Sequence, residues 1–402
     1  MPDTNTSLVA MLPDFLTWQN GNDLTRTACR IHVQYMYHQV KQWSNHANTD
    51  LFHSITSLPT SSQQRLLLAP RFFTLLRSKD EPGPDELDSF RQVLDLERYL
   101  CTQDGARPRG SWTALYDFYF VPEGPVEGKA AACQSGFPFR GSQFRAPRLG
   151  NMVVDAFRPF TEIDFPLPLG EVTNHTPEEL EFITWRVEKS LEQISRISRT
   201  ARTAVDALVQ VLSLIRAPQS VKGTQSFSNK SVLGRMGLAN ADSNRWCISK
   251  IADAIVHESI HALIYKLELT NSLYLDYSVE FEGFTAVSPW SGRTLPLHSF
   301  VHACFVWFGL HNFWALASSE EYKADQLRST AARGFLAGHP LSCLPDAARA
   351  RIQPVVLDAI DRMYKQVNSA STDEVVSSIP DYFEGPSLMF AESRQPERSS
   401  AS

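Results

Sequence analysis

The chain has 402 residues, of which 43% are hydrophobic and 20% charged, a composition typical of globular proteins and long enough for one large domain or two moderate ones. The net charge of -6 and the isoelectric point near 6.0 provide no basic field, so we expect no nucleic-acid partner. The N-terminus has acidic residues early and no long apolar run. We therefore expect no secretory signal and no membrane span, and place the protein in the cytoplasm.

The first part of the chain, residues 1–104, is predicted to be a helical region. Apolar residues recur there at helical spacing over 24–43, 61–77 and 85–100. Between 105 and 168 the pattern changes to aromatic and β-branched stretches broken by Gly and Pro, which predicts short strands and loops.

Residues 176–216 are predicted to form one long helix, with Pro177 in its first turn and acidic residues after it. The segment that follows, SFSNKSVLGRMGLAN at 226–240, has the character of strands punctuated by glycine. The unpaired edge of such a strand can hold an extended peptide by main-chain hydrogen bonds, and we take this as a hypothesis for the present chain.

The most informative stretch is 249–268, SKIADAIVHESIHALIYKLE. Its apolar residues follow the helical repeat, no Gly or Pro interrupts them, and Ser249 is placed to cap the first turn. Within it, residues 257–261 form an HExxH motif. A motif of this kind on a helix, rather than in a loop, is typical of a metal site.

The spacing of the motif explains why it can bind a metal ion. Residues four apart share one helix face, so the imidazoles of His257 and His261 can reach the same ion, with Glu258 near its open coordination positions. Asp253 lies one turn before His257. Its carboxylate could accept the second ring N–H of that histidine, or it could be a solvated charge, and both alternatives stay open.

A second apolar stretch, HSFVHACFVWFGLHNFWAL at 298–316, predicts a buried helix. Two histidines rarely hold a catalytic metal alone, so a third ligand is needed. His302, 41 positions after His261 (302 minus 261), is one candidate, because a histidine buried among apolar residues needs a strong partner such as a metal. His298 lies one turn earlier on the same face and could substitute.

The other candidates for the third ligand are Glu280 and Glu282, which follow His261 by 19 and 21 positions (280 and 282 minus 261). Zinc peptidases of the gluzincin type place a glutamate at about this distance, on a second helix. The aromatic and β-branched residues around Glu282 predict an extended segment instead, which favours His302.

The rest of the chain is predicted to be helical over 320–335 and 346–366, with an interruption at Pro354. We assign 105–368 to the HExxH metal-binding catalytic domain and 369–402, rich in Ser, Glu and Pro, to a C-terminal tail. The predicted fold class is α+β, predominantly helical with a small sheet.

Three segments occur in order: VHESIHAL at 256–263, SPW at 288–290 and LHSFVHACFVW at 297–307. Together they resemble the HExxH-motif proteins of peptide natural-product clusters, described as 2-oxoglutarate-dependent peptide β-hydroxylases. The resemblance extends over roughly 226–316. It implies a metallopeptidase-like HExxH core put to oxidative use.

The resemblance also implies a cofactor set, with Fe(II) held by three histidines and 2-oxoglutarate chelating beside them. The implied ligands are His257, His261 and His302. Three facial ligands leave two positions for the keto acid and one for O₂, whereas a zinc hydrolase needs only a water site and a carbonyl site.

The distal carboxylate of the cosubstrate requires a cation, for which an arginine offers a bidentate fork. Members of the family often have Arg directly after Pro-Trp, where this chain has Ser291. Arg293 is our candidate for cosubstrate binding. The alternatives are Arg235, or a cosubstrate bound in another way.

The leading hypothesis is therefore an iron- and 2-oxoglutarate-dependent dioxygenase that hydroxylates a side-chain β-carbon of a ribosomally made peptide in natural-product biosynthesis. Glu258 would orient water or a ligand. The rival is a zinc-dependent metallopeptidase in which Glu258 is the general base acting on zinc-bound water. A third hypothesis is a non-enzymatic domain that only binds a leader peptide.

Overall fold

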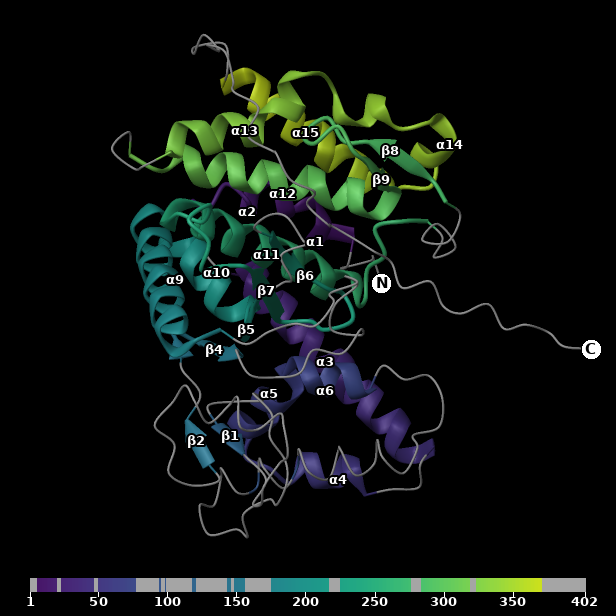
Figure 1. Ribbon diagram of the computed structural model, residues 1–402. Helices are drawn as coiled ribbons and strands as arrows, with labels where there is room; N and C mark the ends of the chain where they lie inside the picture. The colour runs from purple at the N-terminus through teal and green to yellow at the C-terminus, as the bar shows by residue number, and fades with distance from the viewer. Residues whose placement is uncertain are drawn as a thin grey trace, which may run out of the picture.

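The computed structural model shows a predominantly helical protein with a small mixed sheet, as the sequence predicts (Figure 1). The described residues are 6–19, 23–46, 50–76, 94, 98, 118–120, 143–145, 148–155, 175–216, 225–275, 283–318 and 323–370.

The N-terminal part is helical, in agreement with the predictions for 24–43 and 61–77. Its helices are α1 (Thr6–Ala10), α2 (Leu12–Phe15), α3 (Asp23–His46), α4 (Leu51–Thr56), α5 (Thr60–Leu68) and α6 (Pro70–Leu76). Most of the helix predicted at 85–100 lies outside the described residues. Trp18, just after α2, donates its indole N–H to the carbonyl of Gly309, 2.7 Å away, so this N-terminal segment is held against a helix that lies 291 positions later in the chain.

The main sheet is small and mixed, with strand order β3-β4-β5-β7-β6. Its strands are β3 (Arg148–Leu149), β4 (Met152–Asp155), β5 (Val211–Ile215), β6 (Gln225–Ser228) and β7 (Arg235–Ala239). The inner strands β4, β5 and β7 run parallel, whereas β3 and β6 pair antiparallel with their neighbours. Because β6 is the last strand in this order, one of its edges has no strand partner among the described residues.

Two further strand pairs lie outside the main sheet. β1 (Phe118–Phe120) pairs with β2 (Gln143–Arg145), and β8 (Thr285–Val287) pairs with β9 (Thr294–Pro296), both antiparallel. The short strands at 118–155 confirm the expectation for this part of the described chain.

The prediction of one helix over 176–216 is wrong. The structure has α9 (Pro177–Ile197), α10 (Arg199–Leu208) and then strand β5. Ser198 separates the helices because its backbone is extended, with φ -151° and ψ 116°, and its side chain accepts a hydrogen bond from the backbone of Ala201, so it caps α10. The run VLSLI, which fits a helical pattern, is buried as a strand between β4 and β7.

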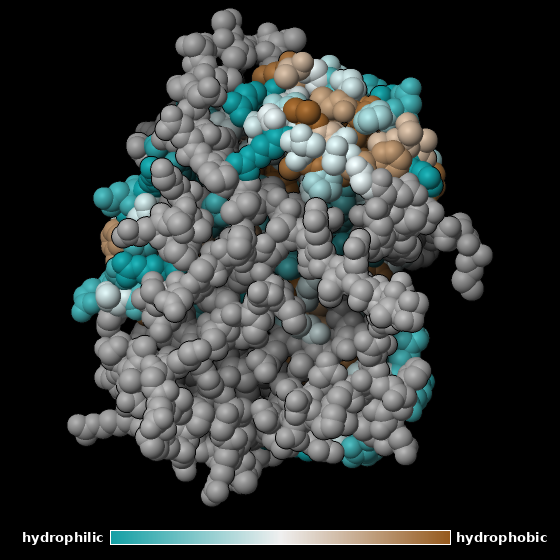
Figure 2. Space-filling model, turned by 45° about the vertical axis from the view of Figure 1, so that its right-hand side comes forward, coloured by the Kyte–Doolittle hydropathy of each residue, from teal (hydrophilic) through white to brown (hydrophobic). Residues whose placement is uncertain are grey.

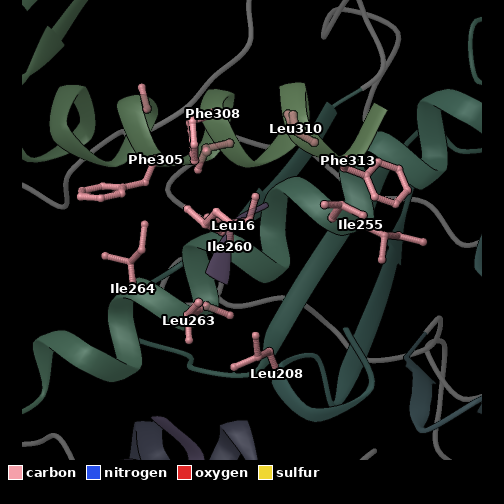
Figure 3. Packing of buried hydrophobic residues seen from close by; sticks show 14 of the residues in the cluster. Leu16, Leu208, Ile255, Ile260, Leu263, Ile264, Phe305, Phe308, Leu310 and Phe313 are labelled. Carbon is pink, nitrogen blue, oxygen red and sulfur yellow. The ribbon is translucent and has the colours of Figure 1, made fainter. Parts of the chain in front are cut away.

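The centre of the molecule is α11 (Ile248–Glu268), which carries the HExxH motif and contacts α3, α9, α10, α12 and β6. α12 (Leu297–Ala315) crosses it and is buried almost throughout, as predicted. Apolar side chains such as Ile260 and Ile264 of α11 face Phe305 and Phe308 of α12 (Figure 3). Cys247, not Ser249, is the N-cap of α11, so that prediction is wrong.

The C-terminal helices α13 (Ala324–Leu336), α14 (Asp346–Arg349) and α15 (Pro354–Ala370) form a layer with α12 at the top of Figure 1. Pro354 is the first residue of α15, where its missing N–H leaves no hydrogen bond unmade, which accounts for the predicted interruption.

The surface in Figure 2 shows pale and brown residues near the top of the molecule, where Figure 1 places these helices and the β8–β9 hairpin. Large apolar side chains that remain exposed include Val287 and Leu275. Within the described parts of the chain, no helix combines the length and apolar character that crossing a bilayer requires.

Candidate metal centre

Two buried helices bring the candidate metal ligands together. On α11, His257, His261 and Glu268 share one face, because 4 and 11 residues are close to whole numbers of helical turns. On α12, His298 and His302 are one turn apart and face α11. All four histidines are at least 93% buried, since their relative exposures are 7%, 2%, 5% and 0% in chain order.

The structure brings the rings of the three predicted ligands next to one another, but within the described residues the group whose donor atoms all lie within 4.8 Å of one another is Glu268, His298 and His302. The ring centroids of His257 and His261 are 5.0 Å apart, and those of His261 and His302 are 5.4 Å apart. Nδ1 of His261 lies 3.2 Å from Nδ1 of His302. Two nitrogens bound to one ion at about 2.1 Å each lie about 3.0–3.4 Å apart at octahedral or tetrahedral angles, so this separation fits a shared metal ion.

The environment keeps these imidazoles neutral. Burial lowers the pKa of His257 to about 3. Burial, followed by the charges of the neighbouring histidines, lowers the pKa of His261 well below its usual value. For His302, burial and the charge of His298 outweigh the opposing effect of Glu268 and lower the pKa to about 4. Neutral imidazoles present the lone pairs that a metal ion binds.

The ring of His257 also fits a metal site. Its Nε2 atom is buried and makes no hydrogen bond to the described residues. A buried ring nitrogen without a partner is unfavourable unless something absent from the polypeptide satisfies it. A metal ion next to His261 and His302 would do so.

Glu268 is the functional candidate that sequence reasoning missed. Its carboxylate lies 3.2 Å from Nε2 of His298 and 3.1 Å from Nε2 of His302. Burial favours the neutral acid, but the charges and hydrogen bonds of His298 and His302 outweigh this effect and lower the pKa of Glu268. Glu268 therefore provides a negative charge beside the two histidines of α12.

Glu258 is oriented by strand β6. The hydroxyl of Ser226 donates a 2.7 Å hydrogen bond to Oε1 of Glu258, which joins the HExxH motif to the edge strand of the sheet. Burial raises the pKa of Glu258 to about 7, and the hydroxyl groups of Ser228 and Ser226 oppose part of this rise. A carboxyl group with a pKa near neutrality is suited to exchanging protons at physiological pH.

Aromatic rings form the wall next to His257. Trp307 meets the His257 ring edge to face, with centroids 6.0 Å apart, and Trp290 stacks on Trp307 at 6.3 Å. Trp290 is buried and donates its indole N–H to the carbonyl of Ala331, 2.9 Å away. The Pro-Trp segment therefore contributes to the site by fixing the position of Trp307.

The basic residues considered as anchors for the cosubstrate lie in different parts of the structure. Arg293 lies half-buried in the turn between β8 and β9, and its carbonyl accepts a 2.7 Å hydrogen bond from the backbone N–H of Ser288. Arg235 is buried and forms an ion pair of 3.1 Å with Asp155, so its guanidinium is already engaged within the sheet. Lys230, in the turn after β6, was not singled out in the sequence. Its charge helps to lower the pKa of His302.

The remaining predicted residues are placed as follows. Asp253 accepts a 2.7 Å hydrogen bond from the indole of Trp314, so its carboxylate contacts α12 rather than His257. Glu280 and Glu282 lie outside the described residues.

The cluster as a whole offers imidazole and carboxylate donors in a water-poor interior, a donor set that suits Fe(II), Zn(II) and similar divalent ions. Comparison with protein-family models and with curated proteins finds no match. The residues of the site therefore carry the functional proposal.

Proposed function

We propose that the protein is an Fe(II)- and 2-oxoglutarate-dependent hydroxylase of the side-chain β-carbon of a ribosomally made peptide, built on a metallopeptidase-like HExxH core and acting in natural-product biosynthesis in the cytoplasm. The observation that carries the proposal is the 3.2 Å separation of Nδ1 of His261 from Nδ1 of His302. Together with the resemblance of 226–316 to the HExxH peptide hydroxylases, it supports His257, His261 and His302 as ligands of the iron.

When bound, Fe(II) and 2-oxoglutarate supply the oxidative chemistry: one atom of O₂ enters the keto acid, which leaves as succinate and CO₂, and the other enters a C–H bond of the peptide. The three imidazoles would hold this ion. The rings of Trp307 and Trp290 cover the His257 side with apolar surface and limit the access of water.

The peptide has a docking edge next to the site. β6 is the edge strand of the main sheet, and Ser226 on this strand is bonded to Glu258. A peptide added to that edge by main-chain hydrogen bonds would pass beside the motif helix. Glu258, fixed by Ser226, is then placed to hydrogen-bond water or a ligand at the metal.

The cosubstrate requires a cation, and Arg293 remains our candidate. The ion pair with Asp155 disfavours Arg235, while Lys230 becomes the second choice because its charge acts on the pKa of His302. We expect Arg293→Gln to raise the KM for 2-oxoglutarate at least about 10-fold, as the loss of a charged anchor does. If Lys230→Gln produces this effect and Arg293→Gln does not, the anchor is Lys230.

The test is anaerobic loading with Fe(II), addition of 2-oxoglutarate and a pool of synthetic peptides, and exposure to air. We expect succinate, together with peptides heavier by one oxygen atom, and loss of both products in His302→Ala. The matched control is His38→Ala, an exposed histidine on α3. Succinate formation at the same level without Fe(II) would contradict the proposal.

The second candidate is a zinc metallopeptidase, and the Ser226–Glu258 hydrogen bond favours it. A carboxylate held next to an HExxH histidine and an edge strand is suited to act as general base on a zinc-bound water. Peptide cleavage with Zn(II), independent of 2-oxoglutarate and absent in Glu258→Gln, would replace the hydroxylase with this function.

A further inference from the structure

We propose that Glu268, His298 and His302 form a second metal-binding position, joined to the HExxH position through the imidazole of His302. The inference rests on the proposed function in one respect, the role of His302 as a ligand of the first ion. The ion bound at this second position would be a divalent first-row transition metal ion.

The geometry of the three side chains fits a single ion. One ligand atom from each lies within 4.8 Å of the others. The carboxylate of Glu268 is 3.2 Å from Nε2 of His298 and 3.1 Å from Nε2 of His302. These separations match the spacing of about 3.0–3.4 Å expected for donors that each lie about 2.1 Å from one ion.

The donor set has a defined chemical preference. Two imidazoles and one carboxylate are the ligands of many non-haem Fe(II) sites and of catalytic zinc sites. The carboxylate gives the negative charge that stabilises a divalent cation away from solvent, since the side chain of Glu268 is only 16% exposed. Glu268 lies on α11 seven residues, or about two helical turns, after His261 (268 minus 261).

His302 connects the two positions because its two ring nitrogens face opposite partners. Nδ1 faces His261, and Nε2 faces Glu268. Ions on both nitrogens would lie roughly 6 Å apart, with each ion about 2.1 Å from the ring. The second ion takes the place of the ring proton directed at Glu268, and this proton is released to solvent.

A simpler role for Glu268 would be to accept the ring N–H of His302 and fix its tautomer beside a single ion. His298 argues against this role. Its ring packs on His302 with centroids 4.2 Å apart, and its Nε2 is 3.2 Å from both oxygens of Glu268. Orienting one histidine does not require a second buried imidazole aimed at the same carboxylate.

The experiment measures metal ions directly. The full-length protein is dialysed against Zn(II), bound zinc per chain is measured by plasma mass spectrometry, and crystals grown with Zn(II) are examined for anomalous peaks at the zinc edge. We expect two ions per chain and two peaks, one on either side of His302. One ion per chain or none, with at most one peak, overturns the inference.

Variants assign the ions to their ligands. We expect Glu268→Gln and His298→Ala to lower the stoichiometry from two to one and to leave the peak at His257 and His261. The control Glu188→Gln, an exposed position on α9, should keep both ions. If Glu268→Gln and His298→Ala still bind two ions, the assignment is wrong. The wild-type peaks decide the question even if a variant does not fold.

The result is independent of catalysis. Two zinc ions without any succinate formation by the iron-loaded protein would support the second position and contradict the hydroxylase. One bound ion together with succinate formation would support the hydroxylase and contradict the second metal position.

Discussion

The ammonium nitrogen of Lys266 lies 2.7 Å from Nδ1 of His32, and both side chains are completely buried between α11 and α3. Burial lowers the pKa of Lys266 to about 8, so the amine still carries its proton at pH 7. Burial and the charge of Lys266 lower the pKa of His32 well below its usual value, so the ring is neutral and accepts the hydrogen bond. The pair holds α3 against the motif helix.

Removal of the acceptor, His32, should lower the stability of the protein more than removal of the charged group, Lys266. We expect His32→Leu to lower the free energy of unfolding by about 3–5 kcal/mol, because it leaves a buried ammonium unpaired. Lys266→Met should lower it less, and the double variant should recover part of the His32→Leu loss. Urea unfolding of the four proteins checks this cycle. Equal losses that simply add would contradict the coupling.

The HExxH ligands should control metal affinity, whereas the glutamate of the motif should not. We expect His261→Ala to weaken Zn(II) binding at the motif position by more than about 100-fold, since loss of a direct ligand exceeds the 10–100-fold typical of outer-shell partners. Glu258→Gln should keep near-native affinity while turnover falls. Competition with a chromogenic chelator measures both, with His38→Ala as the control. Unchanged affinity in His261→Ala would remove this histidine from the site.

Gly334 should affect the site from a distance. A Cβ atom at this position would lie 2.3 Å from the ring of Trp290, which stacks on Trp307 beside His257. We expect Gly334→Ala to displace Trp290, lower stability by about 1–3 kcal/mol as overpacking does, and reduce turnover. Ser329→Ala, exposed on the same helix, should do neither. Unfolding and the Trp fluorescence spectrum report the change; native values for both would contradict it.

The burial of Asp253 should make the free energy of unfolding depend on pH. Burial raises the pKa of Asp253 from 3.8 to about 6, although the hydrogen bond from Trp314 opposes the rise. The folded protein therefore binds this proton more tightly than the unfolded chain. The stabilisation is fully present below about pH 4 and is lost as the pH rises to about 6, by at most about 3 kcal/mol.

Asp253→Asn isolates this effect. The amide keeps an acceptor for the indole but does not ionise. Relative to Asp253→Asn, the wild-type protein should lose stability between pH 4 and pH 6 and show no further change above about pH 7. Denaturant unfolding at several pH values measures the difference, and a constant difference across this range would contradict the prediction.

The sequence was sufficient to predict the two helices that build the site. The 3.6-residue repeat places His257 and His261 together on α11, and the apolar character of α12 makes a histidine such as His302 conspicuous. Both signals are local in the sequence, so they can be recognised without knowledge of the tertiary contacts. They account for the agreement at α11 and α12.

Glu268 could not be assigned from the sequence in the same way. It lies 11 residues after His257, on the same face, and that spacing is a usable signal. However, an acidic residue at the end of a helix is usually solvated. Only the packing of α12 across α11 brings His298 and His302 to its carboxylate, and this packing depends on residues 30 and 34 positions away (298 and 302 minus 268).

The strand β5, which the sequence pattern placed in a helix, was missed for a different reason. The run before Arg216, VLSLI, is apolar at four of its five positions, so its pattern does not distinguish a buried helix from a buried strand. Pairing with β4 and β7 decides the outcome, and such pairing is not encoded in the local pattern.

The crossing of α11 and α12 has a consequence for how the chain is held together. An ion bound by side chains from both helices would cross-link them although a long loop separates them in the sequence. Metal binding should therefore stabilise the contact between α11 and α12 and slow its local unfolding. The rate of hydrogen exchange at the backbone amides of the two helices would then report whether the metal site is occupied, without the need for a substrate.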